Sequence, residues 1–321
     1  KIDNSAQYQA LFGYVKGGTI KNLTVEGSVT TATTSSAYAA GIVAYGNPVT
    51  METCMNRVTV TVTQKGYAAG VAAYANTGST ITGCTNQGNI SGVGGYLGGI
   101  VGTASGVTIT NCINNGDVVD SRRSDTYPYG VGGIAGSAIS ASRITNCGNA
   151  GAVTSHLKNT GGVVGYFAGT AEKCFNSGNV TGIYATGGIV GNISSANTSV
   201  TDCYNTGSIL CNAPTAQYKD SNAKGVGGIV GNTGIGGVTL TNCWNSGHVH
   251  LRGYKSTFEG VGGLVAGVGG ANGQAHAAAQ AVVGRDLHPE GIGRGVLAQA
   301  LGGHGDEGFR RTGLLLLRQQ H

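Results

Sequence analysis

One pattern recurs along the chain with a shortest period near 28 residues, and this repeat restricts the possible folds more than any other feature. Its first half reads G-G-[IVL]-V-G and its second half T-[IL]-T-N-C-x-N-x-G-x-V. The second half is clearest from Cys84 onward, and two degenerate copies begin at Leu23 and Cys54. Cysteine-to-cysteine steps are 30, 28, 35, 27, 29 and 40 residues. Self-similarity at such a period is typical of solenoid proteins.

Each copy contains three short β-prone segments, namely G-I-V, T-I-T and the stretch that ends in G-x-V, and none shows a helical period. Val, Ile and Thr suit strands, and the 60 glycines with only 10% charged residues suit many tight turns. Three strands and three turns form one coil of a parallel β-helix. We therefore predict an all-β fold, a parallel β-helix (β-solenoid) of about eight to nine three-strand coils. The general preference for right-handed crossovers predicts a right-handed coil.

Three positions of the repeat are expected to point inward and to form continuous apolar columns. They are the Ile or Val of G-I-V, the apolar residue three before the cysteine, and the closing Val or Ile. Ile20, Ile81, Ile109 and Ile144 occupy the second of these positions. The glycine two residues before the closing Val is expected to adopt a positive φ at a turn.

Seven of the eight cysteines share one repeat position, so they should stack in a column. Side chains in such a column run parallel, which makes the disulfide torsion hard to reach. We interpret them as small buried thiols, with partial pairing as the alternative, and Cys211 falls outside the pattern. C-x₂-C spacing never occurs, so we predict no zinc site. We also predict no other metal and no cofactor. The column comprises Cys54, Cys84, Cys112, Cys147, Cys174, Cys203 and Cys243.

An asparagine follows each of these seven cysteines by two residues. Stacked amides can hydrogen-bond from one coil to the next, as in cross-β ladders. We therefore predict a structural ladder and not a ligand site. Its members are Asn56, Asn86, Asn114, Asn149, Asn176, Asn205 and Asn245.

The composition changes near Ala266. From there to His321 the chain has no Cys, Tyr or Lys, and the second half of a ninth repeat does not follow. We predict a repeat domain over 1–265 and an atypical tail over 266–321. The tail is either weakly ordered, or a capping segment, or the product of a shifted reading frame.

The copies differ in length mainly between the closing Val and the next G-G, so the insertions should emerge along one edge of the solenoid. Tyrosine offers a flat apolar ring with a hydrogen-bonding tip, which suits sugars or a partner protein. The alternative is that these tyrosines merely cover the edge. The predicted binding edge contains Arg122, Arg123, Tyr127, Tyr129, Tyr184, Tyr218, Lys219, Arg252, Tyr254 and Lys255. Tyr38, Tyr67 and Tyr96 each precede a G-I-V glycine by three residues and should add an aromatic column on this edge.

The combination of G-G-[IVL]-V-G with T-[IL]-x-N-C-x-N-x-G-x-V resembles the GLUG-motif repeats of bacterial surface proteins, over residues 11–265. The resemblance implies a secreted or cell-surface rod that is part of a longer multidomain chain. GLUG repeats accompany some immunoglobulin-cleaving metallopeptidases, where they are non-catalytic. No H-E-x-x-H zinc motif occurs in this chain, so no peptidase activity carries over.

We therefore expect a non-enzymatic module for adhesion or for glycan or protein binding. A structural spacer rod is the first alternative. A polysaccharide-acting β-helix enzyme is the second, and it would need clustered carboxylates, whereas Asp117, Asp120 and Asp125 are the nearest approach to a cluster. Paired threonines such as Thr80 and Thr82 resemble ice-binding arrays, but charged residues interrupt them. A net charge of +5 is too small to suggest a nucleic-acid partner. The chain has no run of 18 apolar residues, so we expect no membrane insertion.

Overall fold

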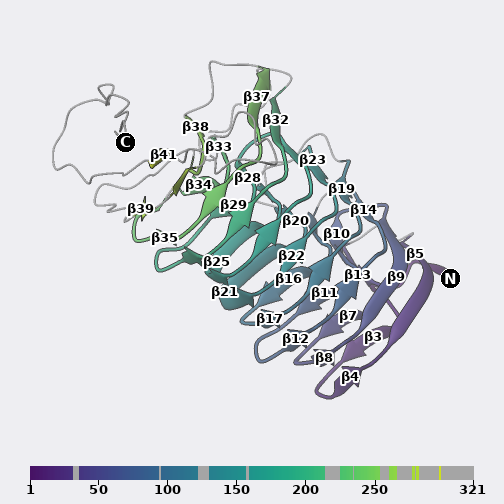
Figure 1. Ribbon diagram of the computed structural model, residues 1–321. Coiled ribbons are helices and arrows are strands. Elements are labelled where there is room, and N and C mark those ends of the chain that lie inside the picture. The colour runs from purple at the N-terminus through teal and green to yellow at the C-terminus, as the bar shows by residue number, and fades with distance from the viewer. Residues whose placement is uncertain are drawn as a thin grey trace, which may run out of the picture.

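The chain winds into a parallel β-solenoid (Figure 1). The computed structural model describes residues 1–31, 36–93, 95–121, 130–156, 159–213, 225–233, 235–253 and 260–265, together with three two-residue strands in the tail. Every regular element among these residues is a β-strand. The predicted fold class is confirmed, since the fold is all-β and built from stacked parallel sheets.

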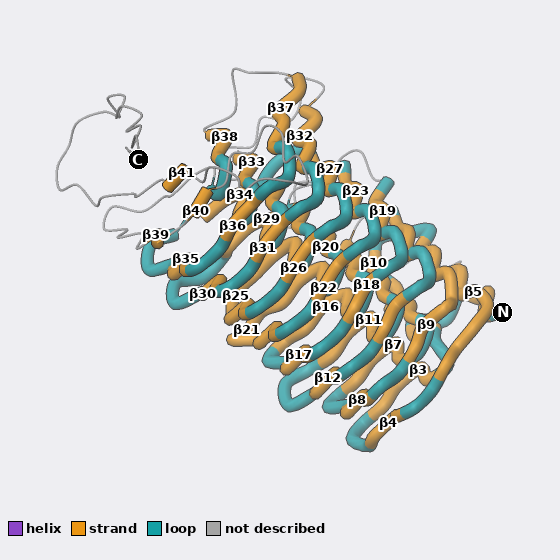
Figure 2. The backbone as a smooth tube through the Cα atoms, in the orientation of Figure 1, coloured by secondary structure: helices purple, strands orange, loops and turns teal. Residues whose placement is uncertain are grey.

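Three long parallel sheets, which we call A, B and C, run along the solenoid (Figure 2). Sheet A contains β1 (Ile2–Asn4), β5 (Thr24–Thr31), β9 (Met55–Val62), β13 (Thr85–Asn86), β14 (Ile90–Gly92), β18 (Ile113–Asn114), β19 (Val118–Asp120), β22 (Gly148–Asn149), β23 (Val153–Ser155), β26 (Phe175–Asn176), β27 (Val180–Gly182), β31 (Tyr204–Asn205), β32 (Ile209–Ala213), β36 (Trp244–Asn245) and β37 (Val249–Gly253). Sheet B contains β2 (Tyr8–Gln9), β6 (Ala37–Ala40), β10 (Gly66–Ala69), β15 (Gly95–Gly98), β20 (Gly130–Gly132), β24 (Thr160–Gly161), β28 (Thr186–Gly187), β33 (Gly225–Gly227) and β38 (Gly260–Gly262).

Sheet C contains β3 (Phe12–Val15), β4 (Thr19–Lys21), β7 (Val43–Gly46), β8 (Thr50–Glu52), β11 (Ala72–Ala75), β12 (Thr80–Thr82), β16 (Val101–Ser105), β17 (Thr108–Thr110), β21 (Ala135–Thr145), β25 (Val164–Glu172), β29 (Val190–Ile193), β30 (Ser199–Thr201), β34 (Val230–Thr233), β35 (Thr239–Thr241) and β39 (Ala277–Ala278). A separate antiparallel pair joins β40 (Gln280–Ala281) to β41 (Val296–Leu297). Apart from β39, β40 and β41, the tail over 266–321 lies outside the described residues.

A middle coil contains five short strands and not the three that the repeat pattern predicts. In the third coil these are β10 to β14. One extra strand arises because the residues before the glycine pair also join a sheet, namely sheet B. The other arises because the turn at Gly88 divides the last segment into β13 and β14. In β9, where Val58 takes the place of that glycine, the same segment is one continuous strand.

The interior contains two main apolar clusters on either side of a column of asparagines. The larger cluster lies between sheets C and A and includes Ile100, Ile109 and Cys112. The second lies between sheets B and A and includes Leu97 and Val118. The three repeat positions predicted to face inward are buried throughout the middle coils.

Each asparagine of the column connects its own turn to the neighbouring coil. The side-chain nitrogen of Asn114 donates to the Gly116 carbonyl and to the side-chain oxygen of Asn149, each at 2.7 Å. Its own side-chain oxygen accepts from Asn86 at 2.7 Å. The same contact at 2.7 Å joins every successive pair from Asn56 to Asn245. Because the amides of the middle coils are fully buried, the column satisfies polar groups that would otherwise be costly inside the solenoid.

Two glycines of the repeat are required by close contacts with this column. A methyl group at Gly99 would lie 2.2 Å from the amide carbon of Asn114, and one at Gly116 would lie 2.1 Å from the Gly88 carbonyl oxygen. The expectation of a positive φ at the second glycine is wrong except at Gly27 (φ 120°). Close approach between successive turns, and not a left-handed backbone, excludes a side chain there.

The positive φ falls instead on the residue directly before the cysteine, where the chain turns from sheet C into sheet A. All eight copies share this corner, with φ between 51° and 63°. Asparagine is a frequent choice because it tolerates this conformation better than most residues. The eight corner residues are Asn22, Thr53, Gly83, Asn111, Asn146, Lys173, Asp202 and Asn242.

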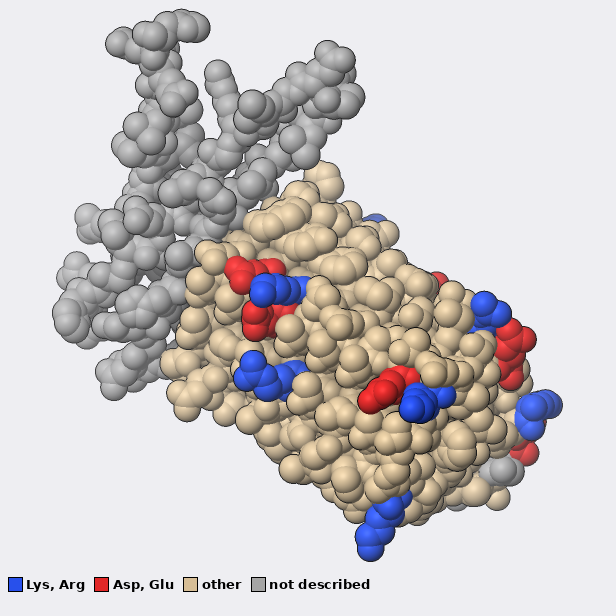
Figure 3. Space-filling model, turned by 60° about the horizontal axis from the view of Figure 1, so that its bottom comes forward, with Lys and Arg blue, Asp and Glu red and all other residues tan. Residues whose placement is uncertain are grey.

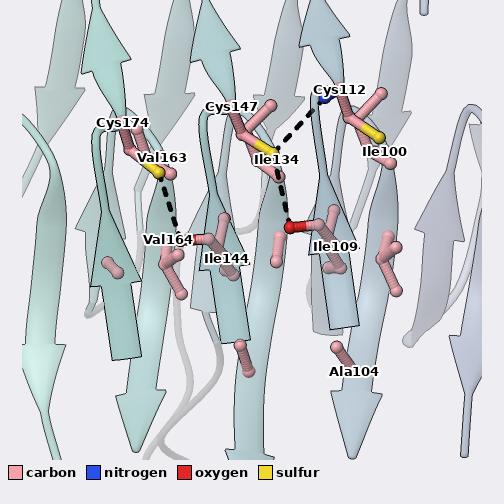
Figure 4. Close-up of a cluster of buried hydrophobic side chains, with 14 of the residues drawn as sticks. Ile100, Ala104, Ile109, Cys112, Ile134, Ile144, Cys147, Val163, Val164 and Cys174 are labelled. Carbon is pink, nitrogen blue, oxygen red and sulfur yellow. Dashed lines mark hydrogen bonds between the residues drawn. The ribbon is translucent and has the colours of Figure 1, made fainter. Parts of the chain in front are cut away.

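The cysteines form a column of free thiols in the larger cluster (Figure 4). The Cys147 thiol donates to the Ile109 carbonyl at 3.7 Å and accepts from the Cys112 backbone N–H at 3.4 Å. Cys211 is also buried, and its thiol donates to the Ile183 carbonyl at 2.9 Å. Burial raises the pKa of Cys211 to about 12, so its thiol stays protonated at neutral pH.

We expect Asn114→Ala to lower the free energy of unfolding by about 3 kcal/mol, because the variant leaves buried partners in two neighbouring coils without their hydrogen bonds. Urea denaturation followed by circular dichroism measures this change. Asn115→Ala is the matched control, because Asn115 is exposed. Equal effects of the two substitutions would contradict the structural role of the column.

We also expect a thiol reagent at pH 8 to modify none of the eight cysteines rapidly in the folded protein, because all eight are buried and free. All eight should react after unfolding in denaturant. Rapid modification of a column cysteine in the native state, with the circular dichroism spectrum unchanged, would show that the core is open to solvent.

Candidate functional site

Two parallel columns of tyrosines cover the surface where sheets B and C meet in the first coils. Strand register places Tyr67 beside Tyr38 and Tyr96 on sheet B, and it places Tyr74 beside Tyr45 on sheet C. We call the seven residues of both columns the tyrosine face. They are Tyr8, Tyr38, Tyr67 and Tyr96 on sheet B, and Tyr14, Tyr45 and Tyr74 on sheet C.

Rings within a column are stacked nearly parallel, and rings of the two columns meet edge to face. The centroids of Tyr38 and Tyr67 are 4.5 Å apart with an interplanar angle of 2°, and those of Tyr45 and Tyr74 are 4.9 Å apart with the same angle. Across the columns, Tyr67 and Tyr74 lie 5.7 Å apart at 78°. Both arrangements are favourable for aromatic pairs. Each ring in the middle of the face is therefore held by several others.

Small residues beneath the rings make room for them. Ala40, Ala44 and Ala73 form a buried floor against which Tyr38 and Tyr67 pack. The floor follows from the sequence Y-A-A-G-I-V-A-Y, which places a tyrosine on each side of the bend between the two sheets and alanines next to the tyrosines.

The face ends where glycine replaces alanine in the floor. A methyl group at Gly102, the position after Ala73 in the column, would lie 2.4 Å from the Ala73 carbonyl oxygen and 3.0 Å from the Tyr96 carbonyl oxygen. At Gly136 it would lie 2.6 Å from the Leu97 nitrogen. The backbones of sheets B and C therefore approach each other more closely from the fourth coil onward. Thr103, which is almost fully buried, continues the column in place of tyrosine.

Stacking determines which parts of the rings remain available. Within a column each ring covers the face of its neighbour, so ring edges and hydroxyl groups are the parts left for a partner. Tyr14 belongs to the first coil and is 50% exposed, and its hydroxyl accepts a 3.4 Å hydrogen bond from the Asn47 amide. The face thus presents rows of neutral hydroxyl groups about one strand spacing apart.

The packing also changes the acidity of the phenols. Burial raises the pKa of Tyr38 well above its ordinary value of 10, and the neighbouring phenols Tyr67, Tyr8, Tyr45 and Tyr74 raise it further. The pKa of Tyr45 is raised for the same two reasons, with burial first. An ionised phenol would lose hydration and would be repelled by any other ionised phenol in the cluster. Tyr38 and Tyr45 are therefore uncharged at neutral pH.

The structure places only some of the residues predicted for the binding edge. Arg122, Arg123, Tyr127, Tyr129, Tyr218, Lys219, Tyr254 and Lys255 lie outside the described residues. Arg252 is exposed at the end of sheet A on β37. Tyr38, Tyr67 and Tyr96 stack in one column, as described above. They are half-buried on sheet B.

The placement of Tyr184 at an exposed edge is wrong, because its side chain is only 3% exposed. The connection from Val180 to Gly187 is among the shortest in the chain, so this segment stays against the sheets and does not loop outward. The carbonyl of Tyr184 accepts a hydrogen bond from the Thr186 hydroxyl within this tight turn.

Sequence reasoning missed the second column of the face. Tyr45 and Tyr74 each follow the G-I-V glycine by four residues, and Tyr14 holds the same position in the first copy. The spacing between them, 31 and 29 residues, could have revealed them. It also missed a third aromatic stack on sheet A, in which Tyr204 lies between Phe175 at 5.5 Å and Trp244 at 4.7 Å. The Phe175 ring lies over Gly148, where a methyl group would be 2.1 Å from it.

Among the described residues the other candidate sites do not assemble, and Asp125 lies outside those residues. Asp120 is buried and its carboxylate accepts from Ser155 at 3.2 Å, while Asp117 is exposed and caps the Ala152 backbone N–H. Paired threonine columns lie on sheet C, with Arg143 in register with Thr108 and Glu52 with Thr82. Within the described ranges, no group of three or more His, Cys, Asp or Glu side chains is placed to hold a metal ion.

Charged side chains are sparse on the surface that Figure 3 shows, where small groups of them are separated by wide uncharged areas. The ion pair between Arg57 and Glu26, at 2.7 Å, is solvent-exposed and so contributes little to stability. Among the residues that the structure describes, none forms a helix long and apolar enough to cross a membrane. Comparison with protein-family models, with curated proteins and with solved structures gives no match.

We expect the folded protein to lose stability as the pH rises above about 10, because Tyr38 and Tyr45 release their protons more readily in the unfolded chain than in the folded one. Their contribution is complete below the ordinary phenol pKa and declines above it. Spectrophotometric titration and thermal melts across this range measure the effect. Tyr38→Phe should flatten the decline, whereas the control Tyr166→Phe should not. Identical profiles for the two variants would contradict this assignment.

Proposed function

We propose that the chain is a non-enzymatic repeat module of a bacterial secreted or cell-surface protein, and that it binds a partner through the tyrosine face. The observation that carries the proposal is the double column itself, in which seven stacked tyrosines lie side by side at the surface. The resemblance of the repeats to the GLUG motif supports the placement at the cell surface.

Tyrosine is suited to recognition because it combines a large apolar ring with a hydrogen-bonding hydroxyl group. Side chains that are ordered before binding lose little conformational entropy when the partner arrives. The rings of Tyr38, Tyr45, Tyr67 and Tyr74 are each fixed by stacking and by edge-to-face contacts. Their order in the free protein therefore favours a binding role.

The covered ring faces favour a protein partner over a sugar that stacks on an aromatic platform. Rows of hydroxyl groups and ring edges suit an uncharged protein surface, and interface cores are enriched in tyrosine and depleted of charge. A glycan bound through its hydroxyl groups is the second candidate, and the more open ring of Tyr14 is its best contact. Adhesion is the cellular role that either partner supports.

A spacer rod is the alternative function, and the continuous asparagine column supports it. Three long sheets join each coil to the next along the solenoid, and the column adds side-chain hydrogen bonds from Asn56 to Asn245. Such a rod would hold neighbouring domains apart without contacting a partner.

The test is binding of the purified chain to a glycan array and to immobilised extracellular proteins. We expect the triple variant Tyr14→Phe, Tyr45→Phe, Tyr74→Phe to keep the stacks, because Phe retains the ring, and to bind at least about ten-fold more weakly through loss of three hydroxyl contacts. The variant Tyr166→Phe, Tyr204→Phe is the matched control and should bind normally.

Two outcomes would contradict the proposed site. Equal binding by the triple variant and the parent chain would rule out the tyrosine face as the binding site. A companion variant Tyr127→Ala, Tyr129→Ala would then test two residues of the predicted binding edge. Absence of binding to both arrays by the folded chain would favour the spacer rod.

A further inference from the structure

We propose that the tyrosine face is a site of covalent oxidative modification, in which one-electron oxidation couples Tyr38 to Tyr67 and Tyr45 to Tyr74 through carbon–carbon bonds. Each bond joins the ring carbons next to the hydroxyl groups and gives a dityrosine within one chain. This inference depends on the ring geometry alone and stands whether or not the face binds a partner.

The two pairs are the most closely parallel in the face. Tyr38 and Tyr67 lie in register on the neighbouring strands β6 and β10, and Tyr45 and Tyr74 lie in register on β7 and β11. In-register parallel strands relate equivalent residues by a simple shift of one strand spacing. With interplanar angles of 2°, equivalent ring carbons are separated by about the centroid distances, 4.5 and 4.9 Å. Radical coupling begins between ring carbons whose π faces are turned toward each other, which is the arrangement in both stacks. Each ring then turns about its side-chain bonds, because the bond in the finished dityrosine lies in the plane of both rings.

The reaction balances with hydrogen peroxide as the oxidant and a haem peroxidase as the catalyst. Each phenol of a pair gives up one electron and its hydroxyl proton and becomes a phenoxyl radical. The two radicals form one carbon–carbon bond next to their oxygens, and the hydrogen on each bonded carbon moves to oxygen, which restores both phenols. The pair loses two hydrogen atoms in total, and hydrogen peroxide accepts them to form two molecules of water.

The chain itself supplies tyrosines that should not couple. Tyr166 has Ser137 and Asn192 as its register neighbours, and Tyr204 lies between Phe175 and Trp244. A radical on either has no adjacent phenol in its column. Inside the face, Tyr14 and Tyr45 are nearly parallel at 4° but are 5.3 Å apart. The pairs of Tyr38 with Tyr8 and of Tyr67 with Tyr96 are inclined at 25° and are 5.3 and 5.5 Å apart. All three pairs should therefore couple less than the two closest pairs.

Coupling would fasten successive coils of the solenoid together. Tyr38 and Tyr67 are separated by 29 positions in the sequence, as are Tyr45 and Tyr74. A covalent bond that closes a loop of this length restricts the unfolded chain and so raises stability, as a disulfide does. The first coils would then resist unfolding without the use of cysteines, all eight of which are buried and free.

The experiment treats the dilute, folded full chain with a haem peroxidase and limiting hydrogen peroxide. Dityrosine fluorescence and the loss of two hydrogen atoms per bond by intact-mass measurement report the reaction. Peptide mapping should identify Tyr38–Tyr67 and Tyr45–Tyr74 as the main crosslinks within monomeric chains. The oxidised monomer should also melt at a higher temperature than the untreated chain.

The variant Tyr38→Phe, Tyr45→Phe keeps the rings and removes one phenol from each pair, and it should form at least ten-fold less dityrosine within the chain. Tyr166→Phe, Tyr204→Phe is the control and should react like the parent. Crosslinks that map mainly to other tyrosines, or that form only between chains, would overturn the proposal. The map of the parent chain decides this even if a variant fails to fold. Parent chain unfolded in denaturant should lose the selectivity.

Discussion

The buried asparagine column is the interaction on which the other features of this solenoid depend. Each amide donates to a carbonyl of its own turn and to the next amide, so removing one leaves polar groups unpaired in two coils at once. The column lies between the two apolar clusters, and its fit requires glycine at positions such as Gly99 and Gly116. The glycine of G-I-V, the asparagine of C-x-N and the glycine of G-x-V therefore recur together because their close packing requires all three.

The side chains at the bend between sheets B and C differ from coil to coil, and this difference creates the tyrosine face in the first coils. Coils with alanine in the floor carry a tyrosine at the next position of sheet C. From Gly102 onward glycine takes that floor position, and the buried Thr103 and Ser137 continue the column before Tyr166. The tyrosine column of the first coils on sheet C therefore ends at the coil in which glycine replaces alanine in the floor. Because the rings stack from one strand to its neighbour along the solenoid, the same contacts that order the face for a partner also bring pairs of phenols close to each other.

Much of the architecture could be predicted from the sequence because the repeat imposes the same environment many times. The period indicated a parallel β-solenoid, and the inward columns of Ile81, Ile109 and Val118 followed from their recurrence. The cysteines at one position gave a column of free thiols, and the asparagines gave a hydrogen-bonded ladder. The predictions were wrong where a residue type can be required for either of two physical reasons. Glycine before the closing Val permits close approach of coils and not a positive φ, and the left-handed corner falls one residue before the cysteine.

The full extent of the candidate site could not be predicted from the repeat, because the repeat does not show which columns of side chains contact each other. Recurrence alone gave Tyr38, Tyr67 and Tyr96 as one column, but their contact with Tyr45 and Tyr74 arises only because the chain bends sharply between sheets B and C. Tyr184 resembled the other tyrosines in sequence, yet a short connection holds it inside the solenoid. The sequence by itself determined which residues stack from coil to coil, because strand pairing in register preserves repeat position. Only the tertiary structure decided which columns face each other, because that depends on the angle between sheets and on the space that each side chain leaves.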